Sequence, residues 1–270
     1  MPQKHYENFP VASFLLPAPL RRPVSVIYRF ARNADDFADE GALAPEERLR
    51  LLDQYRTELR VLQQNREPRS PLFESLATVI RAYDLPFEPF FDLLDAFAQD
   101  VNKRRYAHFG EVMDYCRRSA DPVGRLMLHL YGAALKEHVA WSDSICSALQ
   151  LTNFWQDVAI DYRKDRIYLP QDDMARFGVT ESQIAAQDAG GGWPDLLAFE
   201  IGRTRAMLQS GAPLAKRLPG RIGMELCMIV QGGLRILEKL EGVRGDVFRR
   251  RPVLRPWDWP MMFARAALTR

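Results

Sequence analysis

Two groups of aspartate at helical spacing, far apart in the chain, most constrain how this sequence can fold. The first is DDFADE, at positions 35–40, and the second comprises Asp157, Asp161 and Asp165 within NFWQDVAIDYRKDRIY. Acidic side chains four residues apart share one helix face, where each like-charge pair costs roughly 0.2 to 0.5 kcal/mol. Because both groups carry this cost, we expect a positively charged ligand to lie between the two helices. Mg²⁺ that holds a phosphate fits best.

Helical periodicity extends along nearly the whole chain, and the alternation typical of strands is scarce, so the sequence predicts an all-α fold. The first helix is expected to begin at Pro23 and to end at Gly41, following the preference for proline at helix starts and glycine at helix ends. Thr180, with Gln183 three residues later, marks another helix start. The other expected helices cover residues 45–65, 71–83, 86–101, 110–119, 123–135, 139–161, 195–211 and 221–241.

Composition places the chain among globular proteins. With 270 residues, 47% of them hydrophobic and 27% charged, it can bury a sizeable core, and we expect one domain spanning residues 1–270. The formal net charge is only +2 and the basic residues are spread along the chain, which argues against nucleic acid as a partner. The three cysteines lie in apolar helical patterns without zinc-ligand spacing, as expected of buried, reduced thiols in the cytoplasm.

No targeting or membrane-spanning segment is evident. The N-terminal MPQKHYENFP lacks the order of a signal peptide, and no run of about 18 apolar residues is present. We therefore expect a cytoplasmic protein, either soluble or held peripherally on the inner face of the cytoplasmic membrane. The segment 245–270 is compatible with both a soluble and a membrane-associated protein. Its arginines and tryptophans suit an anionic membrane surface, but its aromatic side chains could equally pack on the domain.

Both aspartate groups lie in polar stripes on helices that are otherwise apolar. On the first helix the stripe contains Tyr28, Arg32, Asp35, Asp36 and Asp39. On the second it contains Gln150, Asn153, Asp157 and Asp161. A solvated helix face would alternate lysine with glutamate, and neither stripe has that pattern at its centre. A binding site is therefore favoured over a plain surface for both helices.

These residue types suit the binding of a diphosphate through Mg²⁺. Carboxylate oxygens are hard ligands, and Mg²⁺ completes its octahedron with water and phosphate oxygens. Metal ions there would neutralise the charge that builds on a leaving diphosphate as its C–O bond ionises. The resulting carbocation requires a water-poor cavity with aromatic faces. Candidates for that lining, each with core packing as the alternative, are Phe9, Phe14, Tyr28, Phe30, Tyr115 and Trp155.

Four ordered segments resemble motifs of the squalene and phytoene synthase family, the head-to-head class of prenyl synthases. They are HYENFP, YRFARNADDFADE, DYCRRSADPVG and LQLTNFWQDVAIDYRKDRIYLP. The resemblance implies an all-α isoprenoid synthase fold, which is a single helical domain with a central cavity. It also implies an Mg²⁺-dependent enzyme that acts on a prenyl diphosphate, with other enzymes of the pathway as further partners.

The resemblance assigns roles to individual residues of these motifs. The implied Mg²⁺ ligands are Asp35, Asp36, Asp39, Asp157 and Asp161, with Asn153 in support. The implied catalytic set is Asp35, Asp39, Asp157, Asp161 and Tyr115, the last in the central cavity. Arg32 and Arg166 would contact the diphosphate. The remaining substrate-binding residues would be Asn8, Phe9, Tyr28, Gln150, Asn153 and Tyr168.

Two segments resemble one branch of the family, the hydroxysqualene synthases of bacterial hopanoid pathways. They are HYENFPVASFLLP, in which Asn8 stands where serine is common, and SADPVG, where many members have AGTVG. This branch would ionise presqualene diphosphate, rearrange the cation and let water capture it, giving hydroxysqualene without NADPH. The absence of a GxGxxG fingerprint mildly favours water capture. The alternative is condensation of two farnesyl or geranylgeranyl diphosphates to presqualene diphosphate, squalene or phytoene.

Two further alternatives concern catalysis itself. Some relatives are non-catalytic assembly factors that have lost metal-binding aspartates, and the intact motifs argue against that role here. Asp121, in the SADPVG segment, either tunes the polarity of the cavity and positions the capturing water, or acts as the N-cap of a helix that continues with Pro122. The sequence favours the N-cap.

Overall fold

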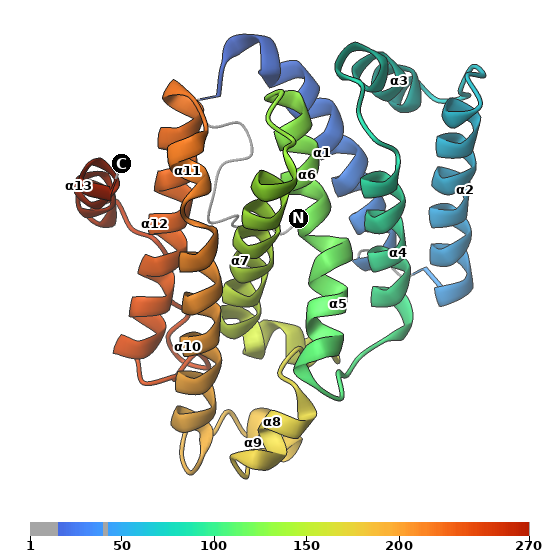
Figure 1. Cartoon of the computed structure of the whole chain (residues 1–270). Helices are drawn as coiled ribbons and strands as arrows, with labels where there is room; N and C mark the ends of the chain where they lie inside the picture. Colours follow the sequence, from blue (N-terminus) through green and yellow to red (C-terminus); the bar gives the residue numbers. More distant parts are fainter. Residues whose placement is uncertain (1–15, 40–42, 270) are drawn as a thin grey trace.

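The computed structural model describes residues 16–39 and 43–269, and these residues form helices without any strand (Figure 1). The helices are α1 (Ala18–Asp39), α2 (Pro45–Gln63), α3 (Pro71–Tyr83), α4 (Glu88–Asn102), α5 (Phe109–Ser119), α6 (Asp121–Leu130), α7 (Lys136–Arg163), α8 (Gln171–Arg176), α9 (Glu181–Ala185), α10 (Trp193–Gly211), α11 (Leu214–Arg217), α12 (Gly220–Gly242) and α13 (Asp258–Thr269). The all-α prediction is confirmed. Gly41 and the candidate residues Asn8, Phe9 and Phe14 lie outside the described residues.

Capping residues explain where two of the helices begin. α3 coincides with the predicted segment 71–83, because Ser70 Oγ accepts a hydrogen bond from Phe73 N at 3.4 Å and Pro71 supplies a favourable first residue. Thr180 caps α9 in the same way, accepting from Gln183 N at 3.3 Å as predicted. Local sequence is therefore sufficient to place these two helix starts.

Three helix boundaries differ from the sequence prediction. α1 begins before Pro23, which lies inside the helix and not at its start. α6 ends before residue 135, because Gly132 has a φ of 62°, a left-handed conformation that glycine adopts without strain. α7 continues past the predicted end at Asp161 to Arg163, and Asp165, which has a φ of 57°, lies beyond it and pairs with Arg105 at the surface. The acidic stripe of α7 therefore contains Asp157 and Asp161, the two aspartates that the predicted stripe includes.

Two large hydrophobic cores hold the helices together, and α7 lies in the middle of the molecule against α5, α6, α10 and α12 (Figure 1). In one core the ring of Phe30 contacts Phe73 and Phe90 at centroid distances of 5.8 and 5.4 Å. In the other, Trp155 Nε1 donates to Thr204 Oγ1 at 2.8 Å. Burial of each such side chain stabilises the fold by about 1.5–3 kcal/mol. Phe30 and Trp155 are therefore core residues, as the alternative prediction allowed.

The C-terminal segment packs on α12 and yet leaves aromatic side chains in solvent. Leu254 and Met262 are buried, and Asp258, only 1% exposed, pairs with Arg235 at 2.8 Å and with Lys239. The large apolar side chains that remain exposed, by 39 to 87%, are Trp257, Trp259, Phe263 and Leu268. Packing on the domain therefore accounts for only part of this segment.

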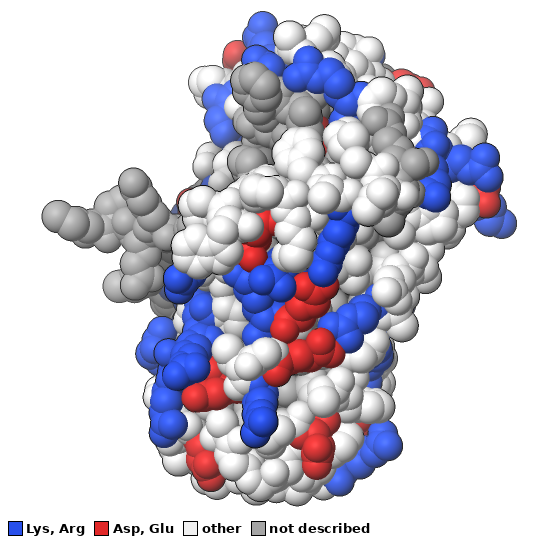
Figure 2. All heavy atoms as spheres, turned by 90° about the vertical axis from the view of Figure 1, so that its left-hand side faces the viewer, with Lys and Arg blue, Asp and Glu red and all other residues white. Residues whose placement is uncertain are grey.

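Charge is mixed on the side of the molecule where α13 lies. Figure 2 turns this side toward the viewer and shows basic next to acidic side chains in its lower half, below a largely uncharged area. None of the described helices combines the length and the apolar character that crossing a bilayer requires. All three cysteines are free: Cys116 and Cys227 are buried, and Cys146 lies on the wall of a cavity.

Candidate active site

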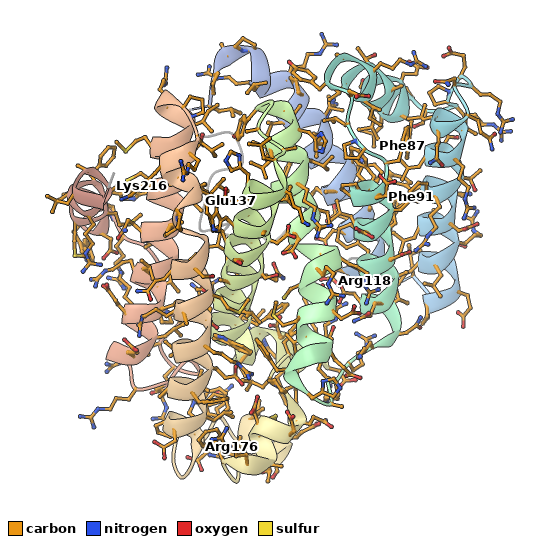
Figure 3. The ribbon with its side chains drawn as sticks, viewed as in Figure 1. Phe87, Phe91, Arg118, Glu137, Arg176 and Lys216 are labelled. Atoms are coloured by element: carbon orange, nitrogen blue, oxygen red, sulfur yellow. The ribbon has the colours of Figure 1, made fainter. Side chains whose placement is uncertain are left out.

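A cavity of about 680 Å³ lies among α1, α4, α5, α6, α7, α11 and α12. Its wall is mostly aliphatic and aromatic, which suits a hydrocarbon ligand. The charged side chains among its described lining residues are Arg32, Asp35 and Glu225. Arg118, labelled in Figure 3, is not part of the wall, and its Nη2 donates to Gln99 Oε1 of α4 at 2.7 Å. The cavity is therefore polar only in places.

Half of the predicted site residues that the structure describes line this cavity. They are Tyr28, Arg32, Asp35, Tyr115, Gln150 and Asn153. The others surround one end of the cavity without being part of its wall; they are Asp36, Asp39, Asp157, Asp161, Arg166 and Tyr168. The structure thus brings together segments that are distant in sequence.

Arg32 holds the two adjacent aspartates of α1. Its guanidinium lies 3.2 Å from Asp35 Oδ2 and 2.7 Å from Asp36 Oδ1. Burial raises the pKa of Asp35 to about 7, with a further upward contribution from the charge of Asp39 and an opposing one from Arg32. A cation placed beside a carboxyl group that is only partly ionised near neutrality stabilises its ionised form.

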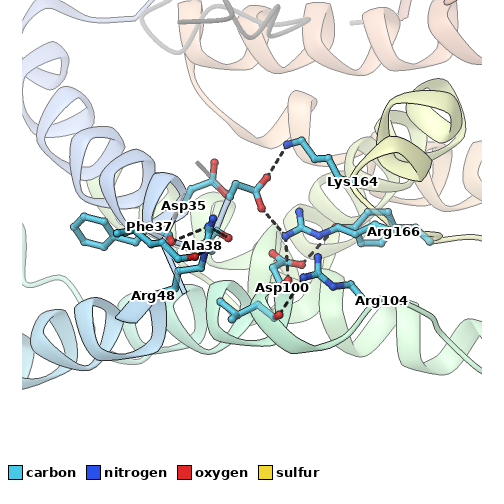
Figure 4. Close-up of polar contacts among 12 residues, drawn as sticks. Asp35, Phe37, Ala38, Arg48, Asp100, Arg104, Lys164 and Arg166 are labelled. Atoms are coloured by element: carbon cyan, nitrogen blue, oxygen red, sulfur yellow. Dashed lines mark hydrogen bonds and ion pairs between the residues drawn. The ribbon is translucent and has the colours of Figure 1, made fainter. Parts of the chain in front are cut away.

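Two cations that follow α7 hold Asp39, at the end of α1 (Figure 4). Lys164 Nζ lies 2.9 Å from Asp39 Oδ2, and Arg166 Nη2 lies 2.5 Å from Asp39 Oδ1. Burial by itself would raise the pKa of Asp39, but the hydrogen bonds and charges of Arg166 and Lys164 outweigh burial, so this pKa lies below its usual value. Asp39 is therefore ionised and shared between two basic side chains.

Asp100 of α4 belongs to this end of the cavity, although the motifs do not include it. Its Oδ2 accepts a hydrogen bond from the Tyr115 hydroxyl at 2.7 Å, and its backbone oxygen accepts one from Arg166 Nη2 at 3.0 Å (Figure 4). Burial raises its pKa to about 6 against the opposing effect of Arg166. The sequence signal that could have revealed it is an acid in register with the buried residues Leu93 and Phe97.

The two aspartates of α7 differ in their partners. Asp157 Oδ2 lies 3.0 Å from Nη2 of Arg251, which comes from the connection between α12 and α13 and lies outside every recognised motif. Asp161 has its pKa raised to about 8, first by burial and then by the charge of Asp157. Asp39 of α1 adds to the same shift, so the acids of α1 and α7 share one electrostatic site.

This set of side chains fits Mg²⁺ that arrives with a diphosphate. In the described part of the chain no group of three or more His, Cys, Asp or Glu residues is arranged to hold a metal unaided. Mg²⁺ needs no such cage, since it usually takes one or two carboxylates and fills its remaining positions with water and substrate phosphate. The carboxyl groups of Asp35 and Asp161, whose pKa values are raised to about 7 and about 8, are the ones a divalent cation would stabilise most.

Aromatic rings lie behind the acidic end of the cavity. Tyr168 stacks on Phe154 with centroids 3.7 Å apart and an interplanar angle of 3°, and its centroid lies 5.7 Å from that of Tyr115. Tyr115 lies on the cavity wall, whereas Tyr168 supports it from behind and reaches Asp100 Oδ1 with its hydroxyl at 3.4 Å. Of the aromatic candidates within the described residues, Tyr28 and Tyr115 therefore line the cavity.

Asp121 does not act as an N-cap, so the favoured prediction for this residue is wrong. α6 begins at Asp121, and Ala120 occupies the N-cap position without a side-chain cap. Asp121 is 4% exposed, its Oδ1 accepts a hydrogen bond from Ser147 Oγ of α7 at 2.7 Å, and burial raises its pKa to about 7. It is not among the residues that line the cavity. Packing of α6 on α7 explains its position better than helix capping does.

The sequence matches the family described as squalene/phytoene synthase over residues 2–258. The chain belongs to this family. Hydroxysqualene synthase of Rhodopseudomonas palustris is 36% identical over 240 residues, which are 87% of this chain and 80% of that protein. Phytoene synthase of Mycobacterium tuberculosis is 32% identical over 79% of this chain and 70% of its own length.

Solved structures of squalene/phytoene synthase family members have the same fold. Squalene synthase HpnC from Alicyclobacillus acidocaldarius is 38% identical, with a TM-score of 0.83 over 89% of this chain and 90% of its own. A dehydrosqualene synthase in complex with ligand has a TM-score of 0.81 at 22% identity, over 94% of this chain and 88% of its own. The all-α isoprenoid synthase fold implied by the motifs is confirmed, and the chain is an isoprenoid synthase.

Proposed function

We propose that the protein converts presqualene diphosphate into hydroxysqualene, as a step of hopanoid biosynthesis, by Mg²⁺-assisted ionisation, carbocation rearrangement and capture by water. The observation that carries this proposal is an apolar cavity that ends beside the aspartates of both α1 and α7. The similarity to hydroxysqualene synthases supports the choice of product.

The aspartates of the two helices would hold the metal. The proposed ligands are Asp35, Asp39, Asp157 and Asp161, with Asp36 and Asn153 in support. When bound, Mg²⁺ supplies positive charge that stabilises the diphosphate as a leaving group. Without the metal, Lys164 and Arg166 neutralise Asp39, and Arg251 neutralises Asp157. These basic side chains would be free to bind diphosphate oxygens once metal ions take their place on the carboxylates.

The rest of the site would bind the substrate and protect the cation. Arg32, on the cavity wall, and Arg166, beside it, would hold the diphosphate, while Gln150 and Tyr168 would help to position it. Tyr28 and Tyr115 present aromatic groups to the cavity, where their rings stabilise positive charge. The Tyr115 hydroxyl donates to Asp100, so this hydroxyl is held in place at the acidic end. The apolar wall limits the access of bulk water to the carbocation.

Condensation of two prenyl diphosphates is the second candidate function. The similarity to phytoene synthases favours keeping it, and the cavity and acids would serve both reactions. A non-catalytic assembly factor is a weaker candidate, because the aspartates of α1 and α7 share one electrostatic site beside a large apolar cavity. Such a factor would have no need of that arrangement.

The exposed face of α13 and the preceding connection is proposed to contact an anionic membrane surface. Trp257, Trp259 and Phe263 are exposed there, and the guanidinium of the exposed Arg255 lies over the ring of Trp257. Interfacial tryptophan with neighbouring arginine is the combination that suits lipid headgroups of negative charge. A lipid substrate would reach the enzyme from such a surface, on the inner face of the cytoplasmic membrane, where other pathway enzymes would supply it.

A product assay tests the proposed reaction. Purified protein with Mg²⁺ and without NADPH receives either presqualene diphosphate or farnesyl diphosphate, and the organic extract is examined by mass spectrometry. We expect hydroxysqualene from the first substrate and no consumption of the second. Consumption of farnesyl diphosphate would instead identify the condensing reaction, and inactivity with both substrates would support the non-catalytic alternative or a different prenyl length.

A further inference from the structure

The turn that follows α7 directs two cations to one carboxylate. Lys164 and Arg166 stand on either side of Asp165, and both reach Asp39 of α1, at 2.9 and 2.5 Å (Figure 4). Residues two apart do not face each other on a helix, so the chain has to leave the helical conformation here for both side chains to meet Asp39. The backbone conformation of Asp165 therefore decides where both cations lie.

Asp165 makes this turn in a left-handed conformation, with a φ of 57°. A left-handed residue commonly ends a helix, and its usual occupant is glycine. The backbone N of Asp165 donates to Tyr162 O at 2.9 Å, as expected of such a turn, but aspartate carries a steric cost there that glycine does not. A residue in this conformation persists where the surrounding structure holds it. The contacts that Asp165 makes beyond α7 are therefore important.

Arg105, in the connection between α4 and α5, supplies these contacts. Its Nη1 donates to the backbone oxygen of Asp165 at 2.7 Å, and its Nη2 donates to Asp165 Oδ1 at 2.9 Å. The same guanidinium forms a two-pronged pair with Glu181 of α9, in which Nε lies 2.7 Å from Oε1 and Nη2 lies 2.9 Å from Oε2. Because a guanidinium presents its donors in one rigid plane, the pair with Glu181 also fixes the donors that hold Asp165.

The backbone next to Arg105 ties down the other side of the turn. Ile167 N donates to Arg104 O at 3.0 Å. Both neighbours of Arg166 in the chain are therefore attached to the same short segment, and Arg166 itself is buried. Arg105 lies outside all four sequence motifs, and it is not among the residues that line the cavity. Any effect of Arg105 on the site must therefore pass through the turn.

We propose that Arg105 is a positioning residue for diphosphate binding, an inference that rests on the proposed function. It holds Asp165 in its left-handed conformation and thereby keeps Lys164 and Arg166 in place. These two cations lie at Asp39, where the diphosphate would bind together with Mg²⁺. Arg105 touches neither the diphosphate nor the metal and acts by fixing the geometry of the groups that do.

Binding of inorganic diphosphate tests this role without any turnover. Wild-type enzyme, Arg105→Ala and Arg105→Lys are titrated with inorganic diphosphate at saturating Mg²⁺ in a calorimeter, and the melting temperature of each is recorded. We expect Arg105→Ala to weaken the affinity about tenfold or more, because small displacements of binding groups are costly. Arg105→Lys should recover little, since one ammonium group cannot replace the planar fork that bridges Asp165 and Glu181. It also carries the test if Arg105→Ala does not fold.

A change at Asp165 shows whether the turn is the route of the effect. Glycine adopts the left-handed conformation without strain, so Arg105→Ala in an Asp165→Gly background should weaken diphosphate binding about threefold at most. Asp165→Asn would preserve the turn, because asparagine tolerates this conformation and keeps the Oδ1 acceptor. An effect of Arg105→Ala that is equally large with aspartate and with glycine at this position would contradict the proposed role.

Arg125→Ala is the matched control for a loss of stability alone. Arg125 forms an equivalent two-pronged pair with Asp143 of α7, at 3.0 and 2.8 Å, and does not line the cavity. Its replacement should lower the melting temperature and leave the affinity for diphosphate at the wild-type value. Wild-type affinity in Arg105→Ala, or an equal loss of affinity in Arg125→Ala, would overturn the role of Arg105. If the wild-type enzyme does not bind inorganic diphosphate with Mg²⁺, the proposed function fails instead, so the two failures are distinguishable.

Discussion

Asp157 of α7 and Arg251 of the α12–α13 connection form a two-pronged ion pair, in which Nε of the guanidinium faces Oδ1 and Nη2 faces Oδ2. Next to it, Gln156 donates to the backbone oxygen of Pro252, so the connection is docked on the second aspartate motif. A metal ion bound to Asp157, as proposed, would compete with an arginine from a segment remote in sequence.

Arg251→Gln should increase the affinity of the metal-free enzyme for Mg²⁺, because a competitor for Asp157 is removed. The expected gain is about twofold to fivefold, since ion pairs near the surface contribute up to about 1 kcal/mol. Calorimetric titration with Mg²⁺ in the presence of inorganic diphosphate measures it. Arg249→Gln changes an exposed arginine two residues away and serves as the control. Unchanged affinity in Arg251→Gln would show that the pair does not compete with the metal.

Asp161→Asn should lower turnover about 100-fold or more, as removal of a single group that stabilises developing charge commonly does. It should also weaken the stabilisation of the protein by Mg²⁺ and inorganic diphosphate in a thermal melt. Asp165→Asn is a stringent control, because Asp165 belongs to the same sequence motif but lies outside α7 at the surface, paired with Arg105. Equal losses in the two variants would contradict the proposed metal site.

The stability of the protein should fall as pH rises from about 4 to about 7, in part because of Asp121. Burial raises the pKa of this carboxyl group from 3.8 to about 7 in the folded state. The unfolded chain therefore ionises first, and the folded state loses stability across this pH range until its own carboxyl group ionises. The loss is on the order of 4 kcal/mol over the whole range, because one pKa unit corresponds to about 1.4 kcal/mol.

Asp121→Asn should abolish this part of the pH dependence, which urea unfolding at pH 5 and pH 8 can measure. Since Asp121 is not on the cavity wall, the variant should also keep the wild-type product ratio. A changed ratio would instead support the alternative in which Asp121 tunes the cavity or positions the capturing water.

Gly124→Ala should destabilise the packing of α6 on α7. A Cβ at Gly124 would lie 2.3 Å from Ser142 Oγ and 2.6 Å from Cys146 Sγ, and such overpacking costs about 1 to 3 kcal/mol. Gly202→Ala, inside α10 with nothing within 4 Å of its Cβ, is the control and should stabilise by up to about 1 kcal/mol. Thermal melts of both variants decide the matter, and equal shifts in melting temperature would argue against close packing at Gly124.

Replacing Trp257, Trp259 and Phe263 together with alanine should reduce sedimentation with anionic vesicles and leave catalysis in detergent solution intact. Deleting residues 245–270 would be a poorer test, because it would also remove the buried Met262 and the partner of Asp157. Leu135→Ala, at a side chain 63% exposed elsewhere on the surface, controls for lost apolar area. Wild-type binding to neutral vesicles as strong as to anionic ones would count against the role of the arginines.

Several features of the fold could be predicted because they depend on residues close together in the chain. Ser70 and Pro71 mark the start of α3, and the spacing of Asp35 and Asp39 places both on one face of α1. The motifs also identify the family and hence the fold, as the comparisons confirm. Gly132 shows the limit of such signals, since its turn divides two helices at a point that periodicity alone places too late.

Other features depend on contacts that no local pattern specifies. Phe30 and Tyr28 are both aromatic residues of α1, yet one lies in the core and the other on the cavity wall. Likewise Asp100 becomes part of the site only because Tyr115 and Arg166 approach it from other segments. The role of each of these residues depends on which helix faces pack against one another in the folded protein.

The sequence by itself therefore determined the helices, the faces on which charged residues gather and the family, because side chains three or four residues apart are neighbours on any helix. Only the tertiary structure decided that Asp39 meets Arg166 and that Arg251 meets Asp157. These relationships arise because helices that are distant in sequence pack together. Which side chains are buried and which charges pair depends on those contacts, and not on the neighbours of a residue along the chain.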